Sequence, residues 1–277
     1  MPELPEVEDA ARRLRIALVG RTIVEAQALH PALAKSLTEA ACHRLTGRRV
    51  MAVTRRAKFQ LVHLDDGQLL EIHFRMTGDW DIGRVSDPPP ALERARFTCA
   101  DDTRVSLVDG RAFGVIRLHD VGAFVMPPLG PEPLDDAFDA AVLASALRPK
   151  RGPIKPVLLD QRVVAGLGNI YAAEALWEAR IRPDTPANSL SPARVARLRD
   201  AIQLVLNAAP SGRYYERKGT ATGTESGTES GTESGATSHE EWRVYGREGE
   251  PCRRCGNRVG RIQQAGRSTF LCRKCQR

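Results

Sequence analysis

Residues 251–277 read PCRRCGNRVGRIQQAGRSTFLCRKCQR, and this stretch decides how the C-terminal part of the chain folds. Two CxxC pairs, Cys252 with Cys255 and Cys272 with Cys275, are separated by sixteen residues. Two close pairs at this spacing are typical of tetrahedral zinc held by four thiolates, a closed site that is structural because no position stays open for water. The segment 258–270 between them predicts two short strands that turn near residues 263–266. Two disulfides are the alternative reading of the same spacing.

The same region carries the basic charge of the chain. The formal net charge is +7 over 277 residues, and residues 243–277 alone hold nine arginines and one lysine against two glutamates. Such a compact cluster suits a phosphate backbone, although a solvated surface is the plainer alternative. No apolar run approaches the length of a membrane span, and the acidic leader MPELPEVED is unlike a signal peptide. A membrane protein and a secreted protein are therefore both disfavoured.

The N-terminal half reads as a domain built on β-sheets. Apolar residues recur every three or four positions from Val7 to Leu18, which predicts a helix with one buried face. From residue 21 to residue 124 the pattern changes to short β-type runs with turn signals. Residues 59–74 and residues 96–108 each predict a hairpin, because alternating apolar runs flank Asp-containing turns.

The second half reads as mainly helical after a proline-rich segment, MPPLGPEPL at 126–134. Residues 154–180 predict a helix, a glycine-punctuated turn and a second helix, with Asn169 placed to cap the second one. Ser191 followed by Pro192 predicts the start of another helix. Residues 223–234 repeat GTES three times, a composition that cannot build a core and is typical of a flexible loop.

The first residues of the chain include candidate catalytic groups. Removal of Met1 would leave Pro2 with a secondary amine, which can attack an aldehydic sugar carbon and form an iminium cation. That cation is an electron sink that promotes elimination of the attached phosphates, and Glu3 can deliver or remove a proton. Lys58, which follows Arg55 and Arg56, can hold a backbone phosphate. An ordinary leader and a solvated strand edge are the alternatives for these two segments.

Seven segments occur in the order of a known family: MPELPEVE, RRAKF, IHFRMTG, DGRAFG, LGPEPL, DQRVVAGLGNIYAAEAL and VYGREGEPCRRC…GRSTFLCRKCQ. Together they resemble the formamidopyrimidine-DNA glycosylase family and cover both ends and the middle of the chain. The Leu4-Pro5 form of the leader is more similar to this family than to its sister, endonuclease VIII. The resemblance implies an α+β multidomain fold that binds one structural zinc ion. The implied first domain is an N-terminal catalytic β-sandwich with flanking helices at 1–125, followed by a linker at 126–135. The implied second part consists of a helical helix–two-turns–helix DNA-binding domain at 136–219, a flexible loop at 220–241 and a four-Cys zinc finger at 242–277.

The resemblance also implies roles for single residues. Pro2 matches the nucleophile and Glu3 matches the acid/base group. Phosphate contacts are implied for Lys58 beside the lesion and for Asn169 and Arg267 around the extruded nucleotide. The side chains inserted into the gap that the extruded base leaves are matched by Met76, Arg111 and Phe113. Further active-site or supporting positions are matched by Lys155, Glu6 and Glu174.

The implied activity is excision of oxidised purines, 8-oxoguanine and formamidopyrimidines, from duplex DNA, followed by strand cleavage through β,δ-elimination. We expect double-stranded DNA with oxidised bases or abasic sites as the partner, a monomer, and a place in the bacterial cytoplasm at the nucleoid. Two alternatives stay open, an endonuclease VIII-like glycosylase for oxidised pyrimidines and an inactive damaged-DNA-binding protein. The sequence departs from the family at the GTES repeats and at Gly110 and Ala112, which puts base preference in doubt.

Overall fold

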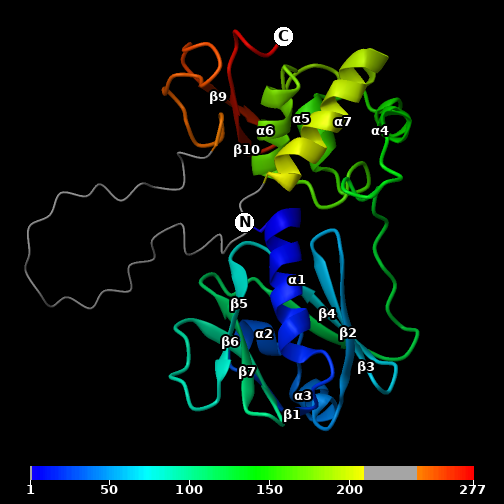
Figure 1. Cartoon of the computed structure of the whole chain (residues 1–277), viewed down its shortest axis with the longest axis vertical. Helices are drawn as coiled ribbons and strands as arrows, with labels where there is room; N and C mark the ends of the chain where they lie inside the picture. Colours follow the sequence, from blue (N-terminus) through cyan, green and yellow to red (C-terminus); the bar gives the residue numbers. More distant parts are fainter. Residues whose placement is uncertain (1, 209–241) are drawn as a thin grey trace, which may run out of the picture. The chain divides into compact units, whose positions relative to one another are not determined.

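The computed structural model describes residues 2–208 and 242–277 (Figure 1). The chain divides into two compact units, Met1–Leu129 and Gly130–Arg277. The GTES repeats, which are predicted to form a loop, lie outside the described residues. Among the helices that are described, none is both long enough and apolar enough to cross a membrane.

The first unit contains two four-stranded antiparallel sheets (Figure 1). In one sheet the strands follow the order β1 (Ile23–Ala28), β6 (Glu93–Cys99), β7 (Thr103–Asp109) and β5 (Gly78–Arg84). In the other they follow the order β2 (Val50–Arg56), β3 (Phe59–Leu64), β4 (Leu69–His73) and β8 (Val115–His119). Apolar residues from both sheets join a single buried core, which includes Phe97 and Val105 from the first sheet and Val53 and Ile72 from the second.

Helix α1 (Leu4–Leu18) packs against strands of both sheets. Its buried residues recur with helical spacing and include Val7, Leu14 and Leu18, which confirms the predicted buried face. Both predicted hairpins are present, as the antiparallel pairs β3–β4 and β6–β7. The short helices α2 (Pro31–Ala34) and α3 (Glu39–Leu45) lie between β1 and β2, where the sequence pattern predicted no particular helix.

The second unit is helical and ends in a hairpin. Helix α6 (Asn169–Glu178) is buried along nearly its whole length and packs against α5 (Ile154–Leu159), α7 (Pro192–Asn207) and β10 (Arg267–Leu271). The helix predicted to start at Ser191 is present as α7, with Ser191 at its N-cap. Strand β9 (Gly260–Gln264) pairs antiparallel with β10, which confirms the predicted zinc-region hairpin. Helix α4 (Ala140–Leu147) and a 3-10 turn, η1 (Ala187–Ser189), also belong to this unit.

The division between the units falls inside the proline-rich segment. The Gly130 N–H donates to the Gln161 carbonyl at 2.8 Å, and the Ala165 N–H donates to the Pro131 carbonyl at 3.0 Å. A Cβ atom on Gly130 would lie 2.7 Å from the Arg162 carbonyl oxygen, so only glycine permits this close approach. The second half of the segment is therefore attached to the helical unit by its own backbone.

Candidate functional site

The first residues of the chain are buried and held in place. Pro2 and Glu3 are both buried, and Glu3 has no exposed surface. Glu3 is the N-cap of α1 and forms a capping box with Glu6, in which the Glu3 N–H donates to Glu6 Oε2 at 2.9 Å. The predicted supporting residue Glu6 thus fixes the direction in which the chain leaves the helix toward Pro2. A carboxylate at a helix N-terminus is also favoured by the positive end of the helix dipole.

Lys58 lies between two strands and belongs to neither of them. It lies in the tight turn between β2 and β3, directly after Ala57, whose φ of 51° is left-handed. The turn forms because β2 and β3 pair up to Arg56 and Phe59, which leaves only two residues to reverse the chain. Lys58 therefore projects from a hairpin end and is partly exposed.

His73, at the end of β4, is a residue that sequence reasoning left unassigned. Its ring meets the Phe59 ring edge to face at 4.8 Å between centroids, and its Nδ1 accepts the Arg75 N–H at 3.0 Å. Burial, followed by the positive charges of Arg75 and Lys58, lowers the pKa of His73 to about 4. The imidazole is therefore neutral near pH 7, and because Nδ1 accepts, Nε2 carries the hydrogen and can donate to an anion.

Asp109 organises the two loops that carry the predicted inserted side chains. It is 1% exposed, and its carboxylate accepts from the Thr77 hydroxyl, from the Arg111 N–H at 3.1 Å and from the Gly114 N–H at 2.7 Å. Thr77 follows Met76, so one carboxylate joins the loop of Met76 to the loop of Arg111 and Phe113. Sequence reasoning missed Asp109, although an aspartate before Gly110 at a strand end is a turn signal.

The side chains on the second of these loops interact with each other. The Arg111 guanidinium lies 4.8 Å from the centre of the Phe113 ring, a cation–π contact. Phe113 is 51% exposed, and it is the one aromatic ring among the exposed large hydrophobic side chains of the described residues. The loop therefore presents a planar apolar surface to solvent.

In the second unit, Lys155 joins two helices to the hairpin. It is 1% exposed, and its Nζ donates to Asn169 Oδ1 at 2.6 Å, to Thr269 Oγ1 at 2.8 Å and to the Ser268 carbonyl at 3.0 Å. Three bonds equal the number of N–H groups on an ammonium. The Asn169 amide also donates to the Ser268 carbonyl at 3.2 Å. Arg267, which is exposed, begins β10 directly before this cluster.

The predicted capping role of Asn169 is wrong. Gly168 is the N-cap of α6 and Asn169 is the first helical residue. Its side-chain oxygen faces the Lys155 ammonium, because a charged donor forms a stronger hydrogen bond than a backbone N–H. The amide is therefore a link to the hairpin and not a helix cap.

Glu174 holds the chain that leads into the zinc finger. It is buried, and its carboxylate accepts the backbone N–H groups of Arg243 at 2.8 Å, Val244 at 2.9 Å and Tyr245 at 2.9 Å. Burial raises the pKa of Glu174, and the three donors oppose that rise by stabilising the charged form. This acid therefore anchors residues 243–245 to α6.

The four C-terminal cysteines form one cluster. Each offers a sulfur, and all four sulfurs lie within 4.8 Å of one another, with the cysteines unpaired by disulfides. The Trp177 indole N–H donates to Cys252 Sγ at 3.4 Å, a hydrogen bond that orients this sulfur and stabilises its thiolate form. Four soft donors at this separation fit one tetrahedral zinc ion, which confirms the structural metal site and not the disulfide alternative. Cys42 and Cys99 are buried in the first unit and lie outside this cluster.

The site residues thus fall into two sets, one in each unit. The first unit holds a buried N-terminus, a lysine turn and a loop pair tied by one carboxylate. The second holds the Lys155 cluster, the Glu174 anchor and the zinc hairpin. A cationic four-Cys finger on a helical unit, in a chain that also has a β-sheet unit, is typical of zinc-containing nucleic-acid-binding proteins.

Comparison with known proteins gives the family. Three family models match: the formamidopyrimidine-DNA glycosylase N-terminal domain at residues 1–116, its H2TH domain at 129–215, and the zinc finger found in FPG and IleRS at 249–277. The chain is 41% identical over 283 residues to the formamidopyrimidine-DNA glycosylase of Sphingopyxis alaskensis and 43% identical over 291 residues to that of Cereibacter sphaeroides, with all of each chain covered. The chain belongs to the formamidopyrimidine-DNA glycosylase family.

Solved structures agree with this assignment. The chain is similar to the Lactococcus lactis glycosylase non-covalently bound to DNA with an AP site, with a TM-score of 0.83, 32% identity and 99% of each chain covered. It is equally similar to MutM in complex with DNA containing carbocyclic 8-oxo-G, with a TM-score of 0.83, 32% identity and 100% of each chain covered. The predicted family, fold class and structural zinc are therefore confirmed.

Proposed function

We propose that this protein excises oxidised purines, 8-oxoguanine and formamidopyrimidines, from duplex DNA and then cleaves the strand at the abasic site. The observation that carries the proposal is the buried Pro2-Glu3 pair at the capped start of α1. A nucleophile needs one fixed direction of attack, and the capping box supplies it by holding the Glu3 backbone. The proposal assumes that Met1 is removed, because a peptide-bonded proline nitrogen is not nucleophilic.

The reaction follows from the chemistry of a secondary amine. The Pro2 nitrogen bonds to the sugar C1′ as the glycosidic bond breaks, and the base leaves with a proton. Opening of the sugar ring gives an iminium ion between Pro2 and C1′, and Glu3 exchanges the proton with the ring oxygen. Loss of a C2′ proton then expels the 3′ phosphate, a second elimination expels the 5′ phosphate, and water releases the amine. Each elimination is favoured because the iminium accepts the electron pair.

Access to C1′ requires the damaged nucleotide to leave the stack, which costs a few kcal/mol. We assign the exposed Phe113 ring with Arg111 stacked on it, together with Met76, to the gap left in the duplex. Solvent exposure of this ring supports that role, because insertion between bases would bury it. Asp109 acts as the positioning residue for both loops.

We assign phosphate contacts to Lys58, Asn169 and Arg267, and add His73, whose neutral imidazole retains a donor at Nε2. Lys155 and Glu174 are positioning residues in this proposal, since both are buried and bonded to protein atoms. The predicted domain boundaries, a monomeric state and a cytoplasmic place at the nucleoid belong to the same proposal.

Borohydride trapping tests the chemistry. Incubation with an 8-oxoguanine duplex and borohydride should give a covalent protein–DNA adduct. Blocking the N-terminus should abolish this adduct, and the substitution Pro2→Gly should strongly reduce it. Pro5→Ala changes a proline in the first turn of the same helix and should leave the adduct intact. Absence of an adduct with every lesion would instead support a damage-binding protein. Faster reaction with oxidised pyrimidines than with oxidised purines would support an endonuclease VIII-like specificity.

A further inference from the structure

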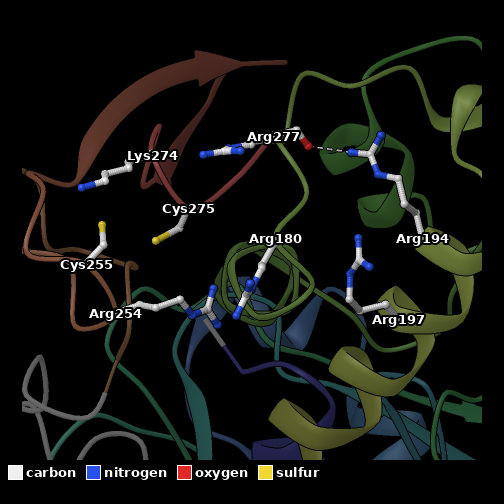
Figure 2. Close-up of a pocket in the computed structure, with 8 residues that line it drawn as sticks. All are labelled: Arg180, Arg194, Arg197, Arg254, Cys255, Lys274, Cys275 and Arg277. Atoms are coloured by element: carbon white, nitrogen blue, oxygen red, sulfur yellow. Dashed lines mark hydrogen bonds between the residues drawn. The ribbon is translucent and has the colours of Figure 1, made fainter.

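The zinc finger and the helices beside it together form a strongly cationic pocket (Figure 2). Its volume is about 650 Å³, and Cys255 and Cys275 lie in its wall. The other lining residues are all cationic: Arg180, Arg194, Arg197, Arg254, Lys274 and Arg277. They come from the end of α6, the first half of α7 and the two cysteine turns, so the pocket is built only from the second unit. We call these residues the cationic pocket.

Three of the arginines are fixed by protein contacts. The Arg254 guanidinium lies over the Trp177 ring at 3.8 Å and donates to the Trp177 carbonyl at 2.9 Å. Arg197 Nε donates to the Ala179 carbonyl at 2.8 Å, and Arg194 donates to the main-chain oxygen of Arg277 at 2.7 Å (Figure 2). These contacts leave further N–H groups on each guanidinium, which has five. The pocket is therefore preorganised and still rich in donors.

The other three cations have no such partners. Within the described part of the chain, the side chains of Arg180, Lys274 and Arg277 make no hydrogen bond or ion pair. Only one carboxylate of the described residues pairs with a lining cation, Glu178, which lies 3.2 Å from Arg254. These cations are therefore not explained by ion pairs inside the protein.

The zinc centre offsets part of this charge but not all of it. Four thiolates around Zn²⁺ carry a formal charge of −2, and Glu178 supplies one more negative charge. Six cationic side chains line the pocket, so these three negative charges leave three positive charges in excess. Like charges held together in a concave site repel each other and raise the local concentration of anions. Planar guanidinium groups match phosphate oxygens in particular.

The pocket is separate from the residues assigned to phosphate contacts above. Asn169 begins α6, whereas Arg180 follows its C-terminal end, and a ten-residue helix is about 15 Å long. Arg267 begins β10, whereas Lys274 and Cys275 follow its other end. An anion in the cationic pocket would therefore lie near the C-terminal ends of α6 and β10, whereas Asn169 and Arg267 lie at the N-terminal ends of these two elements.

We propose that the cationic pocket binds a ligand with several linked phosphates, either the backbone of a nucleic acid segment away from the lesion or a free polyphosphate. Its volume lies within the range of about 300–1,000 Å³ that is typical of small-ligand sites. The inference does not depend on the proposed catalytic reaction. It rests on the excess charge and on donors that the protein leaves unused.

Calorimetric titration of tripolyphosphate into the full-length, zinc-loaded protein tests the site. Before the titration, the lesion site is saturated with a short duplex that carries an abasic-site analogue. The test variant is Arg180→Gln/Lys274→Gln/Arg277→Gln, which removes side chains without structural bonds. Its affinity should fall by about tenfold or more, since charge-assisted hydrogen bonds are lost. The control Lys35→Gln/Arg44→Gln/Arg148→Gln removes three exposed cations elsewhere and should change affinity by less than about twofold. Zinc content and melting temperature are measured for every sample, and Arg180→Gln alone replaces the triple variant if the latter does not fold.

Duplexes of increasing length identify the source of the phosphates. A gain of affinity with length that the pocket variant lacks assigns the site to nucleic acid, whereas tripolyphosphate binding without such a gain assigns it to a free polyphosphate. The proposal is overturned if the wild-type protein binds no tripolyphosphate and shows the same length dependence as the variant. It is also overturned if an acidic peptide of equal charge binds as tightly through the same residues, because the surface then serves a protein partner.

Discussion

Replacing Lys155 by methionine would test the link between the helices and the zinc hairpin. The substitution keeps an unbranched side chain of similar length but removes the buried ammonium that bonds Asn169, Ser268 and Thr269. Each buried acceptor that loses its donor lowers the stability by about 1–3 kcal/mol. Removal of the ammonium also removes its desolvation cost of several kcal/mol, which offsets part of this loss. The balance predicts a loss of about 2–4 kcal/mol in the stability of the second unit.

Hydrogen exchange measures this loss locally, which matters because a chain of two units need not unfold in one step. Amide protection in α6 and β10 should fall by about 30- to 700-fold, since each 1.4 kcal/mol corresponds to a factor of ten. Protection in the strands of the first unit should not change. Binding to a lesion duplex should weaken, because Asn169 and Arg267 lose their common support.

Lys150→Met is the matched control. Lys150 is 34% exposed and pairs with Asp160 at 3.2 Å, and a surface pair of this kind contributes at most about 1 kcal/mol. Lys155→Met and Lys150→Met should therefore differ clearly in the protection of α6. Equal protection in both variants would refute the reasoning, because it would mean that the buried ammonium contributes no more than a surface ion pair.

Two further predictions concern the first unit. Asp109→Ala should lower the stability of the first unit by about 2–4 kcal/mol, because two backbone N–H groups and a hydroxyl lose their acceptor. Thermal melting should show a smaller loss for Asp109→Asn, because asparagine keeps one side-chain oxygen as an acceptor. If the two variants melt alike, the carboxylate does not join the loops. His73→Gln should flatten the dependence of stability on pH. Unfolded histidine takes up a proton near pH 6.5 and folded His73 only near pH 4, so the wild-type protein loses up to about 3 kcal/mol more than the variant as pH falls between these values. Parallel curves of unfolding free energy against pH for the two proteins would contradict this prediction.

The sequence by itself determined the features that depend on residues close together in the chain. The two CxxC pairs and the hairpin between them predict the zinc site, because a knuckle of four residues supplies two ligands whatever surrounds it. The buried face of α1 and the β3–β4 and β6–β7 hairpins follow from periodicity and turn residues in the same way. The quoted motifs also sufficed to indicate the family.

Only the tertiary structure decided which partner each polar side chain takes. Asn169 fits a helix cap by sequence, but its oxygen accepts from Lys155, fourteen residues away, and its amide donates to Ser268 on the hairpin. Asp109 and the cationic pocket depend likewise on strands and turns distant in the chain. The physical reason is competition: several donors and acceptors have similar intrinsic strength, and long-range packing selects the pair that is brought together and shielded from water.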